Sequence, residues 1–332
     1  MSGRHFVNTP EDVTREALEG LQLLYPETII CHRDPAYIVR AGRPRPKVAL
    51  ISGGGAGHEP LHAQFVGNGM LDAAVPGAVF SSPTALQVRA AVEAVDSGHG
   101  ALLIVKNYTG DLLNFSIAAE LLTESAATEI VVVDDDLATD GDTDDGPGRR
   151  GTAAVLAVEK ICGAAAERGW VLADIADLGR RVVAASATLG IALRAGTAPG
   201  HARPSFDLAA GEIEFGVGIH GERGRGTRPA GPVGVLVDEI VDHLAGSGRV
   251  APGDDVIAIV NGLGATHGLE LAITTRELVR ALGERGIGCA RLLAGSFVTS
   301  FDMHGLSITL VRATDEFIDL WNDPVSTPAL RW

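Results

Sequence analysis

The chain has 332 residues, with 27 basic against 42 acidic side chains, which gives a net charge of −15 with histidine neutral. A surface this acidic disfavours partners such as nucleic acids and anionic membranes, and we expect neither. Hydrophobic residues make up 46% of the sequence, which excludes a largely disordered chain, and no apolar run approaches the ~18 residues of a transmembrane helix. At roughly 150 residues per domain, the length predicts two domains.

The N-terminus and the cysteines bear on the cellular compartment. Residues 1–8 contain no apolar signal region, so nothing in them indicates secretion. Cys31, Cys162 and Cys289 lie far apart, which fits neither a disulfide framework nor a C-x-x-C metal knuckle, and we expect them to be reduced in a cytoplasm. No lysine follows a glycine, so a P-loop is absent and any handling of ATP needs another motif or a partner.

Apolar segments alternate along the chain with glycine-containing loops and helical patterns. The predicted helices cover 9–24, 60–68, 83–96, 113–124, 151–168, 171–189, 232–245, 268–284 and 315–321. The predicted strands cover 47–52, 72–80, 101–106, 129–134, 211–218, 256–261, 288–293 and 306–312. Short apolar strands between helices predict two α/β domains, each a mostly parallel or mixed sheet flanked by helices. Because 194–204 is rich in Gly, Ala and Pro, we expect the domains at 1–190 and 191–332.

Three strings match known metal or nucleotide motifs, but their contexts argue against each function. His58–His62 reads H-E-x-x-H, yet the glycines before it and Pro60 place His58 ahead of any helix, whereas a zinc protease needs both histidines on one helix face. Residues 216–221 read G-x-G-x-x-G, but a loop rather than an apolar helix follows. Residues 140–144 (DGDTD) resemble the start of a calcium loop but are not followed by its glycine and glutamate. The sequence therefore predicts no metal site.

A glycine run, Gly53–Gly57, follows a predicted strand and ends at His58. Glycine permits close approach of a ligand, and a glycine loop that runs into a helix presents free backbone N–H groups to oxygen ligands. His58 adds a proton-transfer group or hydrogen-bond donor near neutral pH. The alternative is a plain tight turn with a histidine at the start of a helix.

Lys106 ends another predicted strand, and Asp111 follows in the next loop. Ligand sites in α/β sheets gather at the carboxyl ends of strands, so the loops after Ser52 and Lys106 are expected to converge on one site. There Asp111 could accept a hydroxyl proton and Lys106 could contact a substrate oxygen. The alternative is that Asp111 only caps the helix that follows.

His220 follows the strand that opens the second half of the chain. An imidazole can serve as ligand, base or nucleophile. Arg223, Arg225 and Arg228 come directly behind it, and three arginines there predict contacts with phosphate groups or an acidic partner. A solvated loop is the alternative.

With these residues assembled, the chain resembles the dihydroxyacetone-binding K subunit of dihydroxyacetone kinases. The segments that carry the resemblance, in family order, are Ile51–Pro60, Gly69–Ala74, Val79–Thr84, Leu103–Asp111, Asn114-Phe115, Val131–Asp136, Gly148–Gly151, Val158–Ile161, Gly216–Glu222, Asn261–Gly264, Thr299–Met303 and Ser307–Thr309. The sequence departs from the family pattern at 84–87, at His267 and at His304, which leaves the identity of the ketose open.

The resemblance implies roles for individual residues. His220 matches the histidine that forms a covalent hemiaminal with the carbonyl carbon of the substrate. Asp111 matches the acid that takes the proton from the hydroxyl being phosphorylated, and His58 matches the histidine that hydrogen-bonds the substrate. The further substrate contacts implied are Gly54, Gly55 and Lys106. A covalent bond suits dihydroxyacetone, whose six heavy atoms cap noncovalent binding at about −9 kcal/mol, and it selects a ketone over glycerol.

The resemblance also implies partners. A homodimer is expected, with no cofactor on this chain and no nucleotide site. A separate L subunit would bring Mg-ATP, or a tightly held Mg-ADP that a phosphotransferase-system protein recharges. The arginines behind His220 could receive that subunit or its nucleotide phosphates.

Two alternatives to a dihydroxyacetone kinase subunit stay open. One is a non-enzymatic ketone-sensing coactivator, because such paralogues look like the K subunit. The presence of His220, His58 and Asp111 together favours catalysis, since a pure sensor could lose Asp111. The other is a kinase subunit for a different ketose such as erythrulose, because one extra CHOH group changes selectivity by only about 1–3 kcal/mol.

Overall fold

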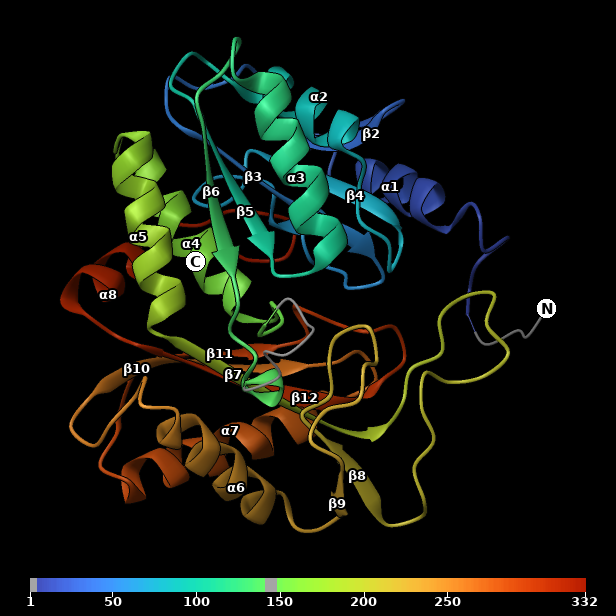
Figure 1. Cartoon of the computed structure of the whole chain (residues 1–332), viewed down its shortest axis with the longest axis vertical. Coiled ribbons are helices and arrows are strands. Elements are labelled where there is room, and N and C mark those ends of the chain that lie inside the picture. Colours follow the sequence, from blue (N-terminus) through green and yellow to red (C-terminus); the bar gives the residue numbers. More distant parts are fainter. Residues whose placement is uncertain (1–4, 141–147) are drawn as a thin grey trace. The chain divides into compact units, whose positions relative to one another are not determined.

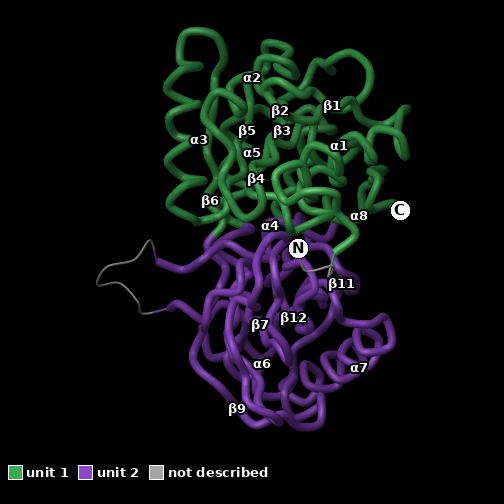
Figure 2. Tube along the Cα trace, turned by 90° about the vertical axis from the view of Figure 1, so that its right-hand side faces the viewer, with its two compact units in different colours: residues 1–133, 158–181, 320–332 green, residues 134–157, 182–319 purple. Residues whose placement is uncertain are grey.

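The computed structural model of the chain describes residues 5–140 and 148–332 (Figure 1), which fall into two compact units (Figure 2). The first unit takes the chain up to residue 133 together with 158–181 and 320–332, and the second takes 134–157 and 182–319. The predicted single boundary near residue 190 is therefore corrected. The Gly, Ala and Pro content after residue 194 indicated a loop, but composition does not show which hydrophobic core a helix or strand packs against. Residues 158–181 belong to the first unit, although residues 134–157 before them belong to the second.

The first unit is built on a mixed sheet with the strand order β1-β2-β4-β3-β5-β6. Its strands are β1 (Ile29–Arg33), β2 (Ala36–Arg40), β3 (Ala49–Ala56), β4 (Ala73–Val79), β5 (Ala101–Lys106) and β6 (Thr128–Val133). β4, β3, β5 and β6 pair in parallel, and the antiparallel hairpin β1-β2 extends the sheet beside β4. Every residue of β5 is buried, as expected for a parallel strand that is covered on both faces.

Helices cover both faces of this sheet. The helices that contribute to the unit are α1 (Val13–Leu24), α2 (Ala85–Val95), α3 (Thr109–Leu122), α4 (Ala154–Glu167, from residue 158) and α5 (Leu172–Ala184, up to residue 181). Val92 of α2 and Phe115 of α3 belong to the core on one face, with Ile51 of β3. On the other face Gly179 of α5 packs so closely that a Cβ there would lie 3.0 Å from Val131 of β6.

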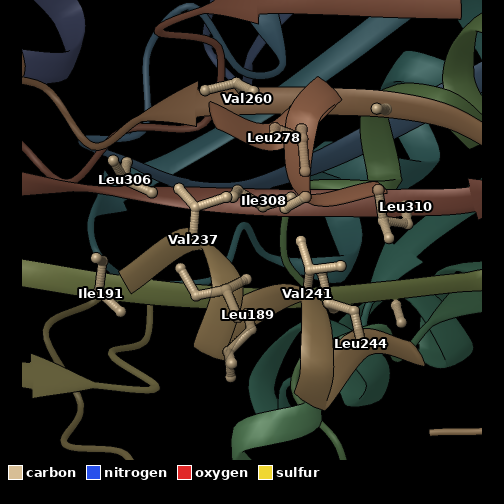
Figure 3. Packing of buried hydrophobic residues seen from close by; sticks show 14 of the residues in the cluster. Leu189, Ile191, Val237, Val241, Leu244, Val260, Leu278, Leu306, Ile308 and Leu310 are labelled. Carbon is tan, nitrogen blue, oxygen red and sulfur yellow. The ribbon is translucent and has the colours of Figure 1, made fainter. Parts of the chain in front are cut away.

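The second unit holds another mixed sheet, in the order β11-β10-β12-β7-β8-β9. Its elements are β7 (Ser186–Arg194), β8 (Glu212–Phe215), β9 (Thr227–Pro229), α6 (Val233–Gly246), β10 (Asp255–Gly262), α7 (Gly268–Glu284), β11 (Gly288–Gly295), β12 (His304–Arg312) and α8 (Asp315–Asn322, up to residue 319). α6 and α7 pack on one face, where Val237, Val241 and Leu278 meet Leu189 and Ile308 (Figure 3). The predicted fold class, two α/β domains with helix-flanked sheets, is confirmed.

Several predicted elements need correction. The helix expected over 60–68 is only a 3₁₀ turn, η1 (Ala63–Phe65), and Gly67 near the end of that span adopts a φ of 157°, which an α-helix excludes. The helix expected over 171–189 ends at Ala184, and the residues that follow it form the buried strand β7. The sequence analysis assigned no element to β1, β2 or β9. By contrast, the predicted bounds of β5 and α7 are confirmed.

Within residues 5–140 and 148–332, no helix is both long enough and apolar enough to span a bilayer. All three cysteines are free thiols, and burial raises the pKa of Cys31 to about 11. Most of the calcium-like string at 140–144 lies outside the described residues.

Candidate active site

The carboxyl ends of β3 and β5 bring three of the predicted residues together. Lys106 ends β5, and Asp111 lies in the first turn of α3, with Nζ 4.0 Å from Oδ2. Both side chains are buried, with 1% and 7% of their surface exposed. A Cβ on Gly54 of β3 would lie 2.5 Å from Lys106 Nζ and 3.5 Å from Asp111 Oδ2. The predicted convergence of the two strand ends is therefore confirmed, and a side chain at position 54 would push the Lys106 amino group away from this position.

The glycine run differs from the prediction. Gly53, Gly54 and Gly55 are part of β3 and pair with residues 75–77 of β4, and no α-helix follows them. The expected helix-start cradle of backbone N–H groups is thus wrong, because Pro60 and the glycines beyond it permit only a 3₁₀ turn. The role of Gly55 is close packing: a Cβ there would lie 2.5 Å from the backbone nitrogen of Ser81.

Asp111 does not act as the helix cap that the alternative interpretation required. The N-cap position of α3 is Tyr108, and no side chain caps this end. Asp111 is the third residue of the helix, where a carboxylate interacts favourably with the positive end of the helix dipole.

Behind Lys106, a buried chain of hydrogen bonds runs through two residues to which the sequence analysis gave no role. Lys106 Nζ donates to Nε2 of His62 at 2.7 Å and to the carbonyl of Gly53 at 3.2 Å. His62 Nδ1 lies 2.6 Å from Oε1 of Glu159, which α4 supplies. Because Lys106 uses the Nε2 lone pair, a neutral His62 carries its proton on Nδ1 and donates it to Glu159.

Burial governs the titration of this chain. Desolvation, with the charges of Lys106 and His58, lowers the pKa of His62 well below its usual range. Desolvation also lowers the pKa of Lys106, against the opposing effect of the carboxyl groups of Asp111 and Glu159. The pKa of Glu159 rises to about 8, again mainly through desolvation, although Lys106 and Ser52 counteract it. Near neutral pH, Glu159 is therefore largely protonated in the folded chain.

His58 lies just beyond β3 and is almost completely buried, with 1% of its surface exposed. Its ring stacks on Phe80, with centroids 5.0 Å apart and 29° between the planes. No helix spans His58 and His62, so the zinc-protease arrangement that H-E-x-x-H requires is not built. The Glu59 carboxylate instead accepts a hydrogen bond from the backbone N–H of Gly57 at 2.9 Å.

In the second unit, a carboxylate orients His220. Nδ1 of His220 lies 2.9 Å from Oε1 of Glu222, and the backbone N–H of His220 donates to Oε2 at 2.9 Å. Burial alone would raise the pKa of Glu222, but the hydrogen bond from His220 and the positive charges of His220 and Arg150 lower it to about 2. A neutral His220 thus carries its proton on Nδ1, which leaves the lone pair on Nε2, and 22% of its side-chain surface is exposed.

The three arginines behind His220 have partners within their own unit. Arg223 donates to the carbonyl of Asp207 at 2.7 Å and keeps 55% of its side chain exposed. Arg225 donates to the carbonyl of Leu137 at 2.7 Å, and Arg228 lies over the ring of Phe215. The predicted contacts with a phosphate or a partner stay a prediction. No helix follows the G-x-G-x-x-G string directly, as expected, but the predicted loop contains the short strand β9.

Sequence reasoning missed His62, Glu159 and Glu222 as site residues. Glu222 lies two residues after His220, and that spacing was the available signal. His62 was considered only as a zinc ligand. Glu159 lies in the Val158–Ile161 segment of the family resemblance, but no local spacing connects it with His62, which is 97 positions away. Among residues 5–140 and 148–332, no group of three His, Cys, Asp or Glu side chains is placed to hold a metal ion.

The fold and these side chains define an α/β protein with acid–base groups at the ends of its strands. It belongs to the Dak1 family, whose domain model matches residues 19–329. The chain is 44% identical to the dihydroxyacetone-binding subunit DhaK of the PEP-dependent dihydroxyacetone kinase of Escherichia coli, over 99% of both chains. It is 41% identical to the corresponding subunit of a PTS-dependent kinase of Lactococcus lactis, over 98% of this chain and 99% of that one.

Solved structures give the same result. The dihydroxyacetone kinase of C. freundii matches with a TM-score of 0.89 and 34% identity over 98% of this chain, which spans 60% of that longer kinase chain. The dihydroxyacetone kinase operon co-activator DhaQ matches with a TM-score of 0.88 and 33% identity, over 95% of this chain and 97% of that one.

Proposed function

We propose that this chain is the dihydroxyacetone-binding subunit of a dihydroxyacetone kinase, a phosphotransferase with an alcohol group as acceptor. The observation that carries the proposal is the 44% identity to a subunit of that name over 99% of both chains. The phosphoryl donor is held by a separate L subunit as Mg-ATP, or as Mg-ADP recharged by a phosphotransferase-system protein, in keeping with the PTS-dependent kinases among the relatives. We expect the chain to act as a homodimer in the cytoplasm.

His220 captures the ketone. The lone pair of Nε2 forms a bond to the carbonyl carbon, the π electrons of the C=O bond move to the oxygen, and that oxygen takes a proton from a water molecule, which is released to the solvent as hydroxide. The imidazole ring becomes positively charged in this step. The carboxylate of Glu222, 2.9 Å from Nδ1, stabilises that charge, and its pKa of about 2 keeps it ionised at neutral pH.

Asp111 accepts the proton of the terminal hydroxyl while the hydroxyl oxygen bonds to the transferred phosphorus. The bond from phosphorus to the donor oxygen breaks, and its electron pair stays with the donor. Lys106 stabilises the negative charge of Asp111 and, with His58 and the backbone of Gly54 and Gly55, contacts the substrate oxygens. A general base of this kind contributes roughly 10²–10⁴-fold to a rate.

The test is a crystal of the protein soaked in dihydroxyacetone. Density that joins His220 Nε2 to the central carbon at about 1.5 Å, the length of a single C–N bond, is the expected result. A His220→Asn variant removes the nucleophile, and His243→Asn is the matched control, because His243 lies on α6 of the same unit. Unmodified His220 at saturating ketone, or capture of glycerol instead, would contradict the proposal.

A ketone-sensing co-activator is the second candidate, because DhaQ matches the fold nearly as well as the kinase does. Capture alone does not separate the two functions. The buried Asp111–Lys106 pair favours the kinase, since capture by His220 needs no base near a terminal hydroxyl. The separating experiment adds an L subunit and Mg-ATP, and phosphorylated ketone forms only if the chain is a kinase subunit. Competition between dihydroxyacetone and erythrulose in that assay identifies the preferred ketose.

A further inference from the structure

The G-R-R-G segment at 148–151 has no role in the function proposed above, yet it places a buried arginine beside His220's carboxylate partner. Arg150 is 7% exposed. Its Nε donates to Oδ2 of Asp136 at 2.8 Å, and its Nη2 lies 2.6 Å from the same oxygen. Nη2 also donates to the carbonyl of Gly216 at 2.8 Å. These bonds fix the guanidinium plane at the start of the segment that carries His220.

The remaining amino group of Arg150 faces Glu222. A Cβ added to Gly218 would lie 2.7 Å from Arg150 Nη1 and 2.2 Å from Oε2 of Glu222, so both groups approach the same face of this glycine. The positive charge of Arg150 is one of the causes that lower the pKa of Glu222. The Asp136 carboxylate, the Arg150 guanidinium and the Glu222 carboxylate thus alternate in charge, and the His220 ring follows as the hydrogen-bond donor to Glu222.

We propose that Arg150, held by Asp136, is a positioning residue that keeps Glu222 as the hydrogen-bond acceptor for His220 Nδ1 and so leaves the lone pair on Nε2. The ketone capture that benefits from it rests on the function proposed above, whereas the tautomer of His220 is a property of the free protein. A purely structural arginine would need only its bonds to Asp136 and Gly216. The approach of Nη1 to the face of Gly218 that Glu222 also occupies is what connects Arg150 to the reacting ring.

The experiment compares two variants, each of which lacks one of two neighbouring ion pairs made by the G-R-R-G segment. Arg150→Gln alone would leave Asp136 buried without its counter-charge, so the test variant carries Arg150→Gln and Asp136→Asn together. The matched control carries Arg149→Gln and Asp134→Asn, which removes the adjacent pair, whose N and O atoms are 3.3 Å apart. Nitrogen NMR of ¹⁵N-histidine-labelled protein then reports the tautomer of His220 across pH, without ligand.

The expected result is a His220 held as the Nδ1–H tautomer in the wild type and in the control, but a mixture of tautomers in the test variant. Capture of dihydroxyacetone should weaken roughly 10- to 100-fold in the test variant, the range expected when a buried charged group loses a partner. Arg150→Lys, which keeps the charge, should restore part of the capture.

A Glu222→Gln background separates positioning from general destabilisation. If Arg150 acts through Glu222, adding Arg150→Gln and Asp136→Asn to Glu222→Gln should weaken capture little beyond the effect of Glu222→Gln alone. The reason is that both changes then remove the same interaction with His220. Full additivity, or an unchanged His220 tautomer in the folded test variant, would overturn the proposal. If the wild type shows the Nδ1–H tautomer but never captures the ketone, the proposed function fails while the positioning role stands.

Discussion

Replacing Glu159 by glutamine should stabilise the protein at alkaline pH and change its stability little at acidic pH. The pKa of Glu159 is about 8 in the folded chain, against 4.5 as its ordinary value. Between these values the folded state holds a proton that the unfolded chain has released, so the free energy of unfolding falls as pH rises. The favourable contribution of the protonated carboxyl is complete below pH 4.5 and is lost as pH rises through about 8. Glutamine has no proton to lose and escapes this penalty.

The size of the effect follows from the interval between the two pKa values. Each pH unit costs about 1.4 kcal/mol, so the upper limit at pH 8 is about 5 kcal/mol. The amide oxygen of glutamine can still accept the hydrogen bond from His62 Nδ1, and therefore the shape of the buried chain is kept. A gain of roughly 2–5 kcal/mol at pH 8, shrinking to nearly zero at pH 5, is the expected outcome.

The assay is urea unfolding of the wild type and the Glu159→Gln variant at pH 5, 6.5 and 8, with capture of ketone as a check on the native state. Glu120→Gln on the exposed face of α3 is the control, and its difference from the wild type should not vary over this range. A Glu159→Gln difference that stays constant from pH 5 to pH 8 would refute the reasoning, because it would mean that Glu159 is ionised in the folded chain throughout.

Three further outcomes test the site. Asp111→Asn should retain ketone capture, measured by the soak, but lose at least about 10²-fold in phosphoryl transfer to ketone with an added L subunit, whereas undiminished transfer would remove Asp111 as the base. Gly54→Ala places a methyl group 2.5 Å from Lys106 Nζ and should cost about 1–3 kcal/mol in urea unfolding as well as transfer activity, while Gly20→Ala, in open space on α1, should stabilise by about 0.5–1 kcal/mol. Mg-ATP with this chain alone should give no phosphorylated ketone by mass spectrometry, and turnover without a partner would refute the two-subunit scheme.

The fold was predictable where the hydrophobic pattern within a single segment is enough to identify a strand or a helix. The continuous apolar run of β5 and the amphipathic pattern of α7 gave correct bounds. Prediction failed where packing between distant segments decides the outcome. Gly53–Gly55 read as a loop because glycine disfavours strands, but the close approach of β4 and of Lys106 makes glycine necessary within β3. Likewise, no local pattern assigns 158–181 to the first unit.

The site was predictable only in part. Lys106 and Asp111 could be placed together because they follow adjacent parallel strands, and the carboxyl ends of such strands share one edge of the sheet. His62 and Glu159 could not be placed together, because their contact joins the segment after β3 to α4, and the H-E-x-x-H spacing of His62 indicates a metal ligand rather than a partner for Lys106. The resemblance to a known family supplied the role of His220, whereas its orientation by Glu222 came from the structure.

Two glutamates, one fully buried and one with 34% of its side chain exposed, show why the sequence pattern does not reveal such roles. Desolvation acts on both Glu159 and Glu222, yet the pKa of one rises to about 8 and that of the other falls to about 2. Glu159 receives one hydrogen bond from a neutral His62 and only partial compensation from Lys106, so desolvation prevails. Glu222 accepts two hydrogen bonds from His220 and faces Arg150, so the charged form prevails. One carboxyl is thereby fitted to hold a proton at neutral pH and the other to stabilise a cation.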